Sequence, residues 1–211
     1  MSGLIVCAAI FAGINQTYAQ NTKPHLGFKA GIDEMTLGSI NQNGGKGNYD
    51  YRVGLQIGLY ADVPLSSKLS FIPQALFTQK GGKLTGPTTA PNSHIITAGE
   101  IDYFDVPLLI GFKLAPRITI SAGPQVSFFS SQNTTRQEVG SFDIVNGRNY
   151  TNDGFKKVLI GGNVGVGYAF CRSFGLNLHY MHDFQSPGSG NSTLINGEIN
   201  SGFALTVSYL F

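Results

Sequence analysis

The stretch SGFALTVSYLF, residues 201–211, decides the fold class of this chain. Its side chains form two rows of alternate residues: Phe203, Leu205, Val207, Tyr209 and Phe211 in one row, and Gly202, Ala204, Thr206, Ser208 and Leu210 in the other. A period of two indicates a β-strand, because successive side chains point to opposite faces. An apolar row that ends on aromatic residues is typical of a membrane β-barrel strand, whose apolar row faces lipid.

The composition fits one β-rich membrane domain. The chain has 211 residues, 28 glycines and 12% charged residues, about half the globular norm of roughly 25%. No apolar run reaches the ~18 residues of a spanning helix. The net charge of +2 gives no support for a nucleic-acid partner.

The N-terminus resembles a signal peptide. The apolar stretch 4–14 is followed by small residues at Thr17 and Ala19, which predicts cleavage between Ala19 and Gln20. No Lys or Arg precedes the stretch, which is a departure from the usual pattern, and a buried strand or a lipid-modified Cys7 fits it less well. We therefore predict a signal peptide, 1–19, and a barrel domain, 20–211. Cleavage leaves Cys171 as the only cysteine, which excludes an intramolecular disulfide and a metal site built on cysteines.

Alternating segments predict eight strands, at roughly 25–37, 51–63, 68–80, 101–114, 117–130, 157–170, 174–185 and 201–211. Tight turns alternate with four long segments rich in Gly, Asn, Ser and Thr, at 38–50, 81–100, 131–156 and 186–200. An even strand count with this alternation predicts an all-β fold, an eight-stranded antiparallel up-and-down transmembrane barrel. In that layout the short turns and both termini are periplasmic, and the long loops are extracellular.

The two faces of the expected strands support a membrane barrel. In the segments around 53–63, 104–114, 158–170 and 174–184, the apolar row carries no Asp, Glu, Lys or Arg. Charge on a lipid face costs about 2–4 kcal/mol at mid-bilayer, so this absence is expected there. Aromatic residues fall near the expected strand ends. The alternatives are a soluble sandwich and a lipocalin-like barrel whose apolar row points inward.

Three prolines interrupt the expected strands, at Pro73, Pro107 and Pro124. Proline cannot donate a hydrogen bond to the ladder, so each is predicted to mark a bulge. The stretches FKAGI (28–32), FIPQALFTQKG (71–81), YFDVPLL (103–109) and AGPQV (122–126) resemble the PorT-like outer-membrane β-barrel family of Bacteroidetes. The resemblance covers nearly all of 20–211. It implies an eight-stranded outer-membrane barrel, with only some members linked to protein secretion, and it supplies no catalytic motif.

The inward row is expected to carry the charges of the strands. A predicted inward polar cluster with a structural role consists of Lys29, Arg52, Asp62, Asp105, Lys113, Arg117 and Asp183. Asp33, Lys80, Gln56, Gln74 and Gln125 share that row. Eight strands leave an interior that side chains fill, so we expect Arg52, Lys113 and Arg117 to pair with Asp62, Asp105 and Asp183 in a solid polar plug. A narrow gated ion pathway is the alternative, and the strand number excludes a wide pore.

His179, His182 and Asp183 form the only cluster that suggests catalysis. A lipid-modifying enzyme using His182 needs a serine or similar nucleophile within reach, and the outward neighbour two residues on is Phe184. We therefore predict no catalytic activity, no cofactor and no metal. The expected role is structural, surface-interaction or secretion-associated. The expected partners are outer-membrane lipids and the barrel-assembly machinery, which would recognise the C-terminal strand through Tyr209 and Phe211.

Overall fold

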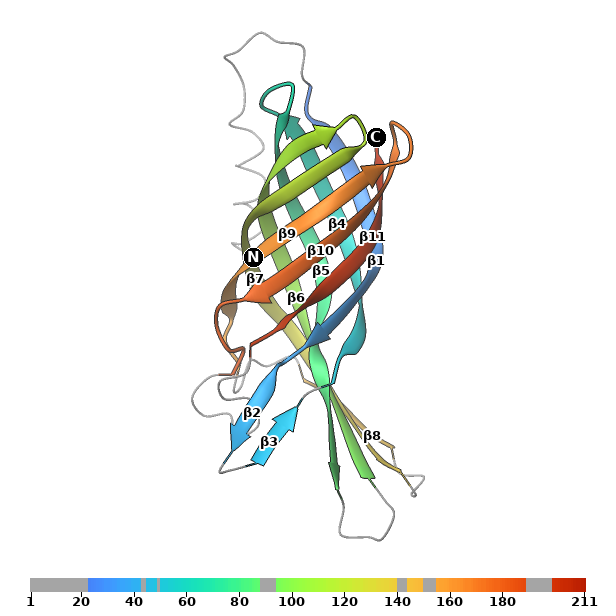
Figure 1. Cartoon of the computed structure of the whole chain (residues 1–211). Coiled ribbons are helices and arrows are strands. Elements are labelled where there is room, and N and C mark those ends of the chain that lie inside the picture. Colours follow the sequence, from blue (N-terminus) through green and yellow to red (C-terminus); the bar gives the residue numbers. More distant parts are fainter. Residues whose placement is uncertain are drawn as a thin grey trace.

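The computed structural model describes residues 23–42, 45–48, 50–87, 94–139, 144–149, 155–188 and 199–211 (Figure 1). The predicted signal peptide, 1–19, with its cleavage site at Ala19 and Gln20, lies outside these residues. The strands are β1 (His25–Thr36), β2 (Ser39–Gln42), β3 (Gly45–Asn48), β4 (Arg52–Pro64), β5 (Leu69–Pro87), β6 (His94–Ala115), β7 (Ile118–Val139), β8 (Ile144–Asn149), β9 (Val158–Ala169), β10 (Phe174–Asp183) and β11 (Ser201–Leu210).

Eight of the described strands close into one antiparallel barrel. The order is β1-β4-β5-β6-β7-β9-β10-β11, and β11 pairs back with β1. Closure follows from the alternating sequence, because strands with one lipid-facing row must satisfy every backbone group within the wall. The predicted fold is therefore confirmed. None of the described residues forms a helix long and apolar enough to cross a membrane.

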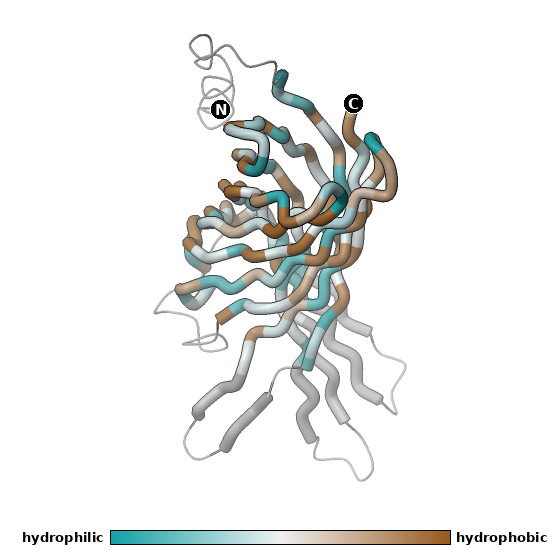
Figure 2. Tube along the Cα trace, turned by 45° about the horizontal axis from the view of Figure 1, so that its top comes forward, coloured by the Kyte–Doolittle hydropathy of each residue, from teal (hydrophilic) through white to brown (hydrophobic). Residues whose placement is uncertain are grey.

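The apolar row faces outward and the small polar row faces the interior. In β11, Phe203 is 47% exposed whereas Ala204 and Thr206 are fully buried. The same alternation of hydropathy runs along the other barrel strands (Figure 2). This orientation contradicts the lipocalin-like alternative, in which the apolar row points inward.

Aromatic side chains pack together near both ends of the outward face. At the end that carries the short turns and the C-terminus, the ring centroids of Phe174 and Tyr209 lie 5.0 Å apart. Tyr180 and Phe203, at the opposite end of β10 and β11, have ring centroids 5.1 Å apart. This arrangement is typical of the two aromatic girdles of outer-membrane barrels. We call the two ends the turn end and the loop end.

The loop end is more regular than the sequence predicts. The long segments 38–50, 81–100 and 131–156 are predicted as loops, yet β5 pairs with β6 as far as Pro87 and His94, and β2 and β3 form a separate hairpin. β8 pairs with β7, from Gln132 opposite Asn149 to Gln137 opposite Ile144. Beyond the lipid belt a strand needs no apolar row, so these Gly- and Thr-rich pairs lack the alternation on which the prediction depends.

The prediction of bulges at the three prolines is wrong. Pairing is interrupted between Pro73 and Leu76 against β6, and between Pro107 and Ile110 against β7, but the register resumes unchanged after both gaps. Pro124 lies within an unbroken register with β9. The register shifts between β6 and β7 lie instead at Asp102/Tyr103 and Lys113/Ala115. The barrel wall thus accommodates the missing N–H donors of the prolines by omitting residue pairs, without a change of register.

Candidate functional site: the polar interior of the barrel

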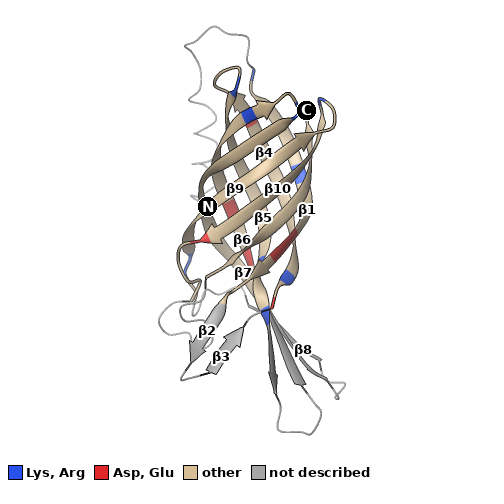
Figure 3. Cartoon of the chain, in the orientation of Figure 1, with Lys and Arg blue, Asp and Glu red and all other residues tan. Residues whose placement is uncertain are grey.

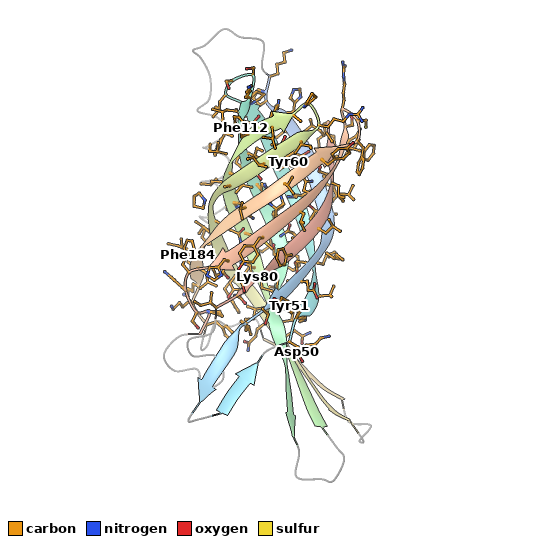
Figure 4. All side chains as sticks on the ribbon, in the orientation of Figure 1. Asp50, Tyr51, Tyr60, Lys80, Phe112 and Phe184 are labelled. Carbon is orange, nitrogen blue, oxygen red and sulfur yellow. The ribbon has the colours of Figure 1, made fainter. Side chains whose placement is uncertain are left out.

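Lys80 is the centre of the buried polar interior. It projects from β5, it is fully buried, and its Nζ lies 3.4 Å from Asp105 on β6 and 3.1 Å from Asp183 on β10. The same nitrogen donates to Ser127 Oγ on β7 at 3.0 Å. Its Nζ also lies 5.1 Å from the ring centroid of Tyr103. Figure 4 shows Lys80 inside the barrel, nearer the loop end than the turn end. One cation therefore joins four strands across the lumen.

Hydrogen bonds continue from this centre toward the turn end. Gln125 Nε2 donates to Asp105 Oδ2 at 3.0 Å, and Asn163 Nδ2 donates to Gln125 Oε1 at 3.0 Å. His179 Nδ1 lies 2.8 Å from Asn163 Oδ1. Because that amide oxygen only accepts, His179 carries its proton on Nδ1. The chain of contacts thus runs across the lumen from Lys80 to His179.

Lys29 ends this chain on the turn side. Its Nζ donates to Gln74 Oε1 at 3.1 Å and lies 3.5 Å from His179 Nε2, which accepts in the tautomer just assigned. On the loop side, Asn200 Nδ2 donates to Asp183 Oδ2 at 3.0 Å. We call this connected set the lumen network; it comprises Lys29, Gln74, Lys80, Asp105, Gln125, Asn163, His179, Asp183 and Asn200.

Glycines on the inward rows make room for the lumen network. A methyl group added at Gly165 would lie 2.4 Å from His179 Nδ1, and one added at Gly161 would lie 2.9 Å from Asp183 Oδ1. Such distances are shorter than real Cβ contacts, so a larger residue at either position displaces the polar group. The alternation of glycine with long polar residues therefore packs the interior.

The structure separates the residues of the predicted polar cluster. Lys29, Asp105 and Asp183 are buried in the lumen network, Arg52 and Asp62 are half-buried at opposite ends, and Lys113 and Arg117 are exposed at the turn end. The predicted pairing is wrong: Lys80 is the partner of both Asp105 and Asp183, and Arg52 pairs with Glu100 on β6. Register across several strands decides these partners, and no sequence signal gives it.

The outward His182 has one polar neighbour that the sequence did not indicate. Ser201 lies opposite His182 in the register of β10 and β11, so the two side chains share the outward face. Nδ1 of His182 is buried and has no hydrogen-bond partner among the described residues. Its ring stacks at 6.4 Å on Tyr180 instead. The pair is close, but its side chains are not joined as a nucleophile and base would be.

The sequence comparison assigns the family. The model of the outer membrane protein beta-barrel domain matches residues 18–186. The chain belongs to this outer-membrane β-barrel family. It is accordingly a small integral protein of the outer membrane, with outer-membrane lipids around its apolar face. The match is to the family as a whole. A search of the curated proteins found no similar sequence.

Several solved structures are similar to the chain at low identity. Ail, the attachment invasion locus protein of Yersinia pestis, solved with the heparin analogue sucrose octasulfate, is 9% identical, with a TM-score of 0.49 over 90% of this chain and 99% of that chain. Neisserial surface protein A is 13% identical, with a TM-score of 0.40 over 91% of this chain and 100% of that chain. The N-terminal barrel of Pseudomonas aeruginosa OprF is 12% identical, with a TM-score of 0.36 over 90% of this chain and 100% of that chain.

Proposed function

We propose that this family member is a non-catalytic barrel that acts as a closed scaffold in the outer membrane. Its role is structural, in surface interaction or in protein secretion as in PorT-like relatives. The observation that carries the proposal is the lumen network, because Lys80 and its two carboxylates fill the interior of the eight-stranded barrel in its loop half. A barrel filled in this way supports its loops and turns and does not transport solutes.

The hairpins at the loop end favour a role at the cell surface. β5 and β6 remain paired beyond the outward aromatic residues Phe77 and Phe104, and β7 and β8 pair beside them. Backbone pairing of this kind holds a binding surface away from the lipid without a separate domain. We infer that the loop end is extracellular and that the short turns and both termini are periplasmic.

Planar-bilayer recordings test the closed scaffold. The purified protein is expected to give no steady conductance under conditions in which a porin of 16 or more strands conducts through its aqueous lumen. Brief, small openings agree with a mobile plug. Large stable steps would overturn the proposal and favour the gated ion pathway.

Cys171 tests the orientation, because it is exposed in the turn between β9 and β10. A membrane-impermeant maleimide should leave it unlabelled in intact cells and should label it once the outer membrane is permeabilised. Labelling in intact cells would place the short turns outside and would reverse the proposed orientation. A Cys171→Ser variant controls for labelling at other sites.

The position of Ser201 opposite His182 favours one second candidate, a lipid-modifying enzyme. In that mechanism His182 accepts the proton of Ser201 Oγ while the oxygen attacks an acyl ester at the membrane surface. The ester C–O bond breaks as the acyl-serine forms, and His182 returns the proton to the leaving alcohol. Phospholipase and acyl-transfer assays on purified protein decide between the two candidates. Turnover that is lost in both Ser201→Ala and His182→Ala would establish the enzyme, whereas the closed scaffold predicts no turnover by any of the three proteins.

A further inference from the structure

The lumen has a cavity at the turn end, beyond Lys29. Its volume is about 220 Å³, and its wall includes Lys29, Gln74 and His179 together with residues of the turns. This volume is smaller than the roughly 300–1,000 Å³ of pockets for drug-sized ligands. It is still several times the ~30 Å³ that a water molecule occupies in the liquid. The cavity thus has room for a small ion with a few waters.

Positive charge dominates the lining of this cavity. Lys29 lies on the wall, Lys113 lies near the end of β6, and Arg117 and Arg172 lie in turns. Among the described residues, Asp62 is the only acidic one in the lining. Lys113, Arg117 and Arg172 are exposed, so they surround the entrance. Figure 3 shows basic segments at both ends of the barrel, whereas the acidic ones lie mainly in its loop half.

Lys29 is a buried cation without a carboxylate partner among the described residues. It is 3% exposed, and its two polar contacts are the neutral groups of Gln74 and His179. Asp62 lies four residues along β4 from Gly58, which pairs with Lys29, and this spacing corresponds to roughly 13 Å. Asp33 lies four residues along β1, at a similar distance. A buried charge without a counter-ion is costly, so an anion in the cavity would stabilise the charged form of Lys29.

Two buried polar atoms of the cavity wall, Ser70 Oγ and Asp62 Oδ1, have no hydrogen-bond partner in the described structure. A buried hydroxyl without a partner is rare in native proteins and indicates a missing ligand or water. Lys29 has three donors and two protein contacts, so it can donate to an oxygen atom of a bound anion.

We propose that the turn-end cavity binds a small oxyanion, of the phosphate or carboxylate class. Lys29 makes the buried charge-assisted contact with the anion. Lys113, Arg117 and Arg172 attract the anion to the entrance. The lumen network closes the cavity on its inner side, so the anion enters and leaves only at the turn end. The site is independent of the closed-scaffold role and of any partner at the loop end.

Calorimetric titration with inorganic phosphate tests the proposal on the purified full-length barrel in a zwitterionic detergent and a low-chloride buffer. Saturable binding is expected, and Lys29→Met should weaken it at least tenfold, since a charge-assisted contact is lost. Lys68→Met is the matched control, because Lys68 is exposed at the same end and does not line the cavity. Binding without saturation, or equal affinity in wild type and Lys29→Met, would overturn the proposal.

Two further arms keep the test decisive. If Lys29→Met does not assemble, as judged by its heat-dependent gel mobility, the double variant Arg117→Gln/Arg172→Gln replaces it and should weaken phosphate binding several-fold. Unchanged affinity in that variant would also overturn the proposal. Competition by vesicles containing phosphatidylglycerol would identify a lipid phosphate as the source of the anion, whereas phosphatidylcholine vesicles alone should not compete.

Discussion

Replacing Lys80 by Met tests whether the lumen network stabilises the barrel. The side chains of Asp105 and Asp183 are 0% and 2% exposed, and Lys80 is their shared cation. Removing one partner of a buried ion pair costs about 3–5 kcal/mol, because the remaining charge stays buried and uncompensated. Here two carboxylates lose their partner, so we expect a loss of at least about 3 kcal/mol in a total stability that is typically about 5–15 kcal/mol.

The assay is equilibrium unfolding by urea of protein inserted in lipid vesicles. The chain has no tryptophan and has nine tyrosines, so far-ultraviolet circular dichroism and tyrosine fluorescence report folding. With a urea dependence of about 1–3 kcal/mol per M, the midpoint of Lys80→Met should fall by about 2 M. Lys68→Met is the control, because its side chain is exposed, and it should shift the midpoint by less than about 0.3 M.

A triple variant separates charge from packing in the same experiment. Lys80→Met combined with Asp105→Asn and Asp183→Asn removes all three charges and keeps the approximate volume. Replacing a whole buried ionic group by neutral residues is often neutral or stabilising, so most of the loss should be recovered. A Lys80→Met midpoint within about 0.5 M of wild type would refute the reasoning, since the carboxylates would then not depend on Lys80.

Four other substitutions test the faces and the packing of the barrel. Leu108→Arg should block assembly, because Leu108 is 38% exposed on the lipid face and the charge costs about 2–4 kcal/mol there. The control Thr119→Arg should assemble, because Thr119 lines the turn-end cavity. Equal tolerance of the two variants in a gel-shift assay would show that the faces are inverted. Gln125→Arg should also lower the unfolding midpoint, since Gln125 is 1% exposed and both the nitrogen and the oxygen of its side-chain amide are hydrogen-bonded. An unchanged midpoint would contradict the packed interior. Gly165→Ala should destabilise by about 1–3 kcal/mol through contact with His179, and its effect should be less than additive with His179→Ala in a double-mutant cycle.

The faces of the strands were predictable because lipid imposes them locally. A lipid-facing row excludes charge at every second residue, so a single strand such as β11 already indicates which side is outward. The aromatic residues near the strand ends are equally local, since they depend on depth in the membrane. These signals required no knowledge of which strand lies beside which.

The pairing of the interior charges was not predictable, because it depends on how far each strand is shifted against the next. The registers, continued across the gap between Pro73 and Leu76, lead from Gly27 through Tyr60, Gln74, Pro107, Gln125 and Gly161 to Asp183. Asp183 N donates to Asn200 O on the β11 side. The path returns to β1 about ten residues beyond its start, which is the shear of a tilted eight-stranded barrel. This accumulated shift brings Lys80, from the loop half of β5, level with Asp183 and Asp105.

The same shear explains why the two ends of the lumen differ. Asp105, Asp183 and Lys80 come to one level and neutralise most of one another's charge, so the loop half of the interior is packed and closed. Lys29 is joined to this group only through neutral side chains. The chain of hydrogen bonds runs from Asp105 through Gln125, Asn163 and His179 to Lys29. Its charge therefore remains uncompensated on the side where the turns bring three more cations together. The proposed closed scaffold thus retains, at its turn end, a cavity whose basic lining favours an anion.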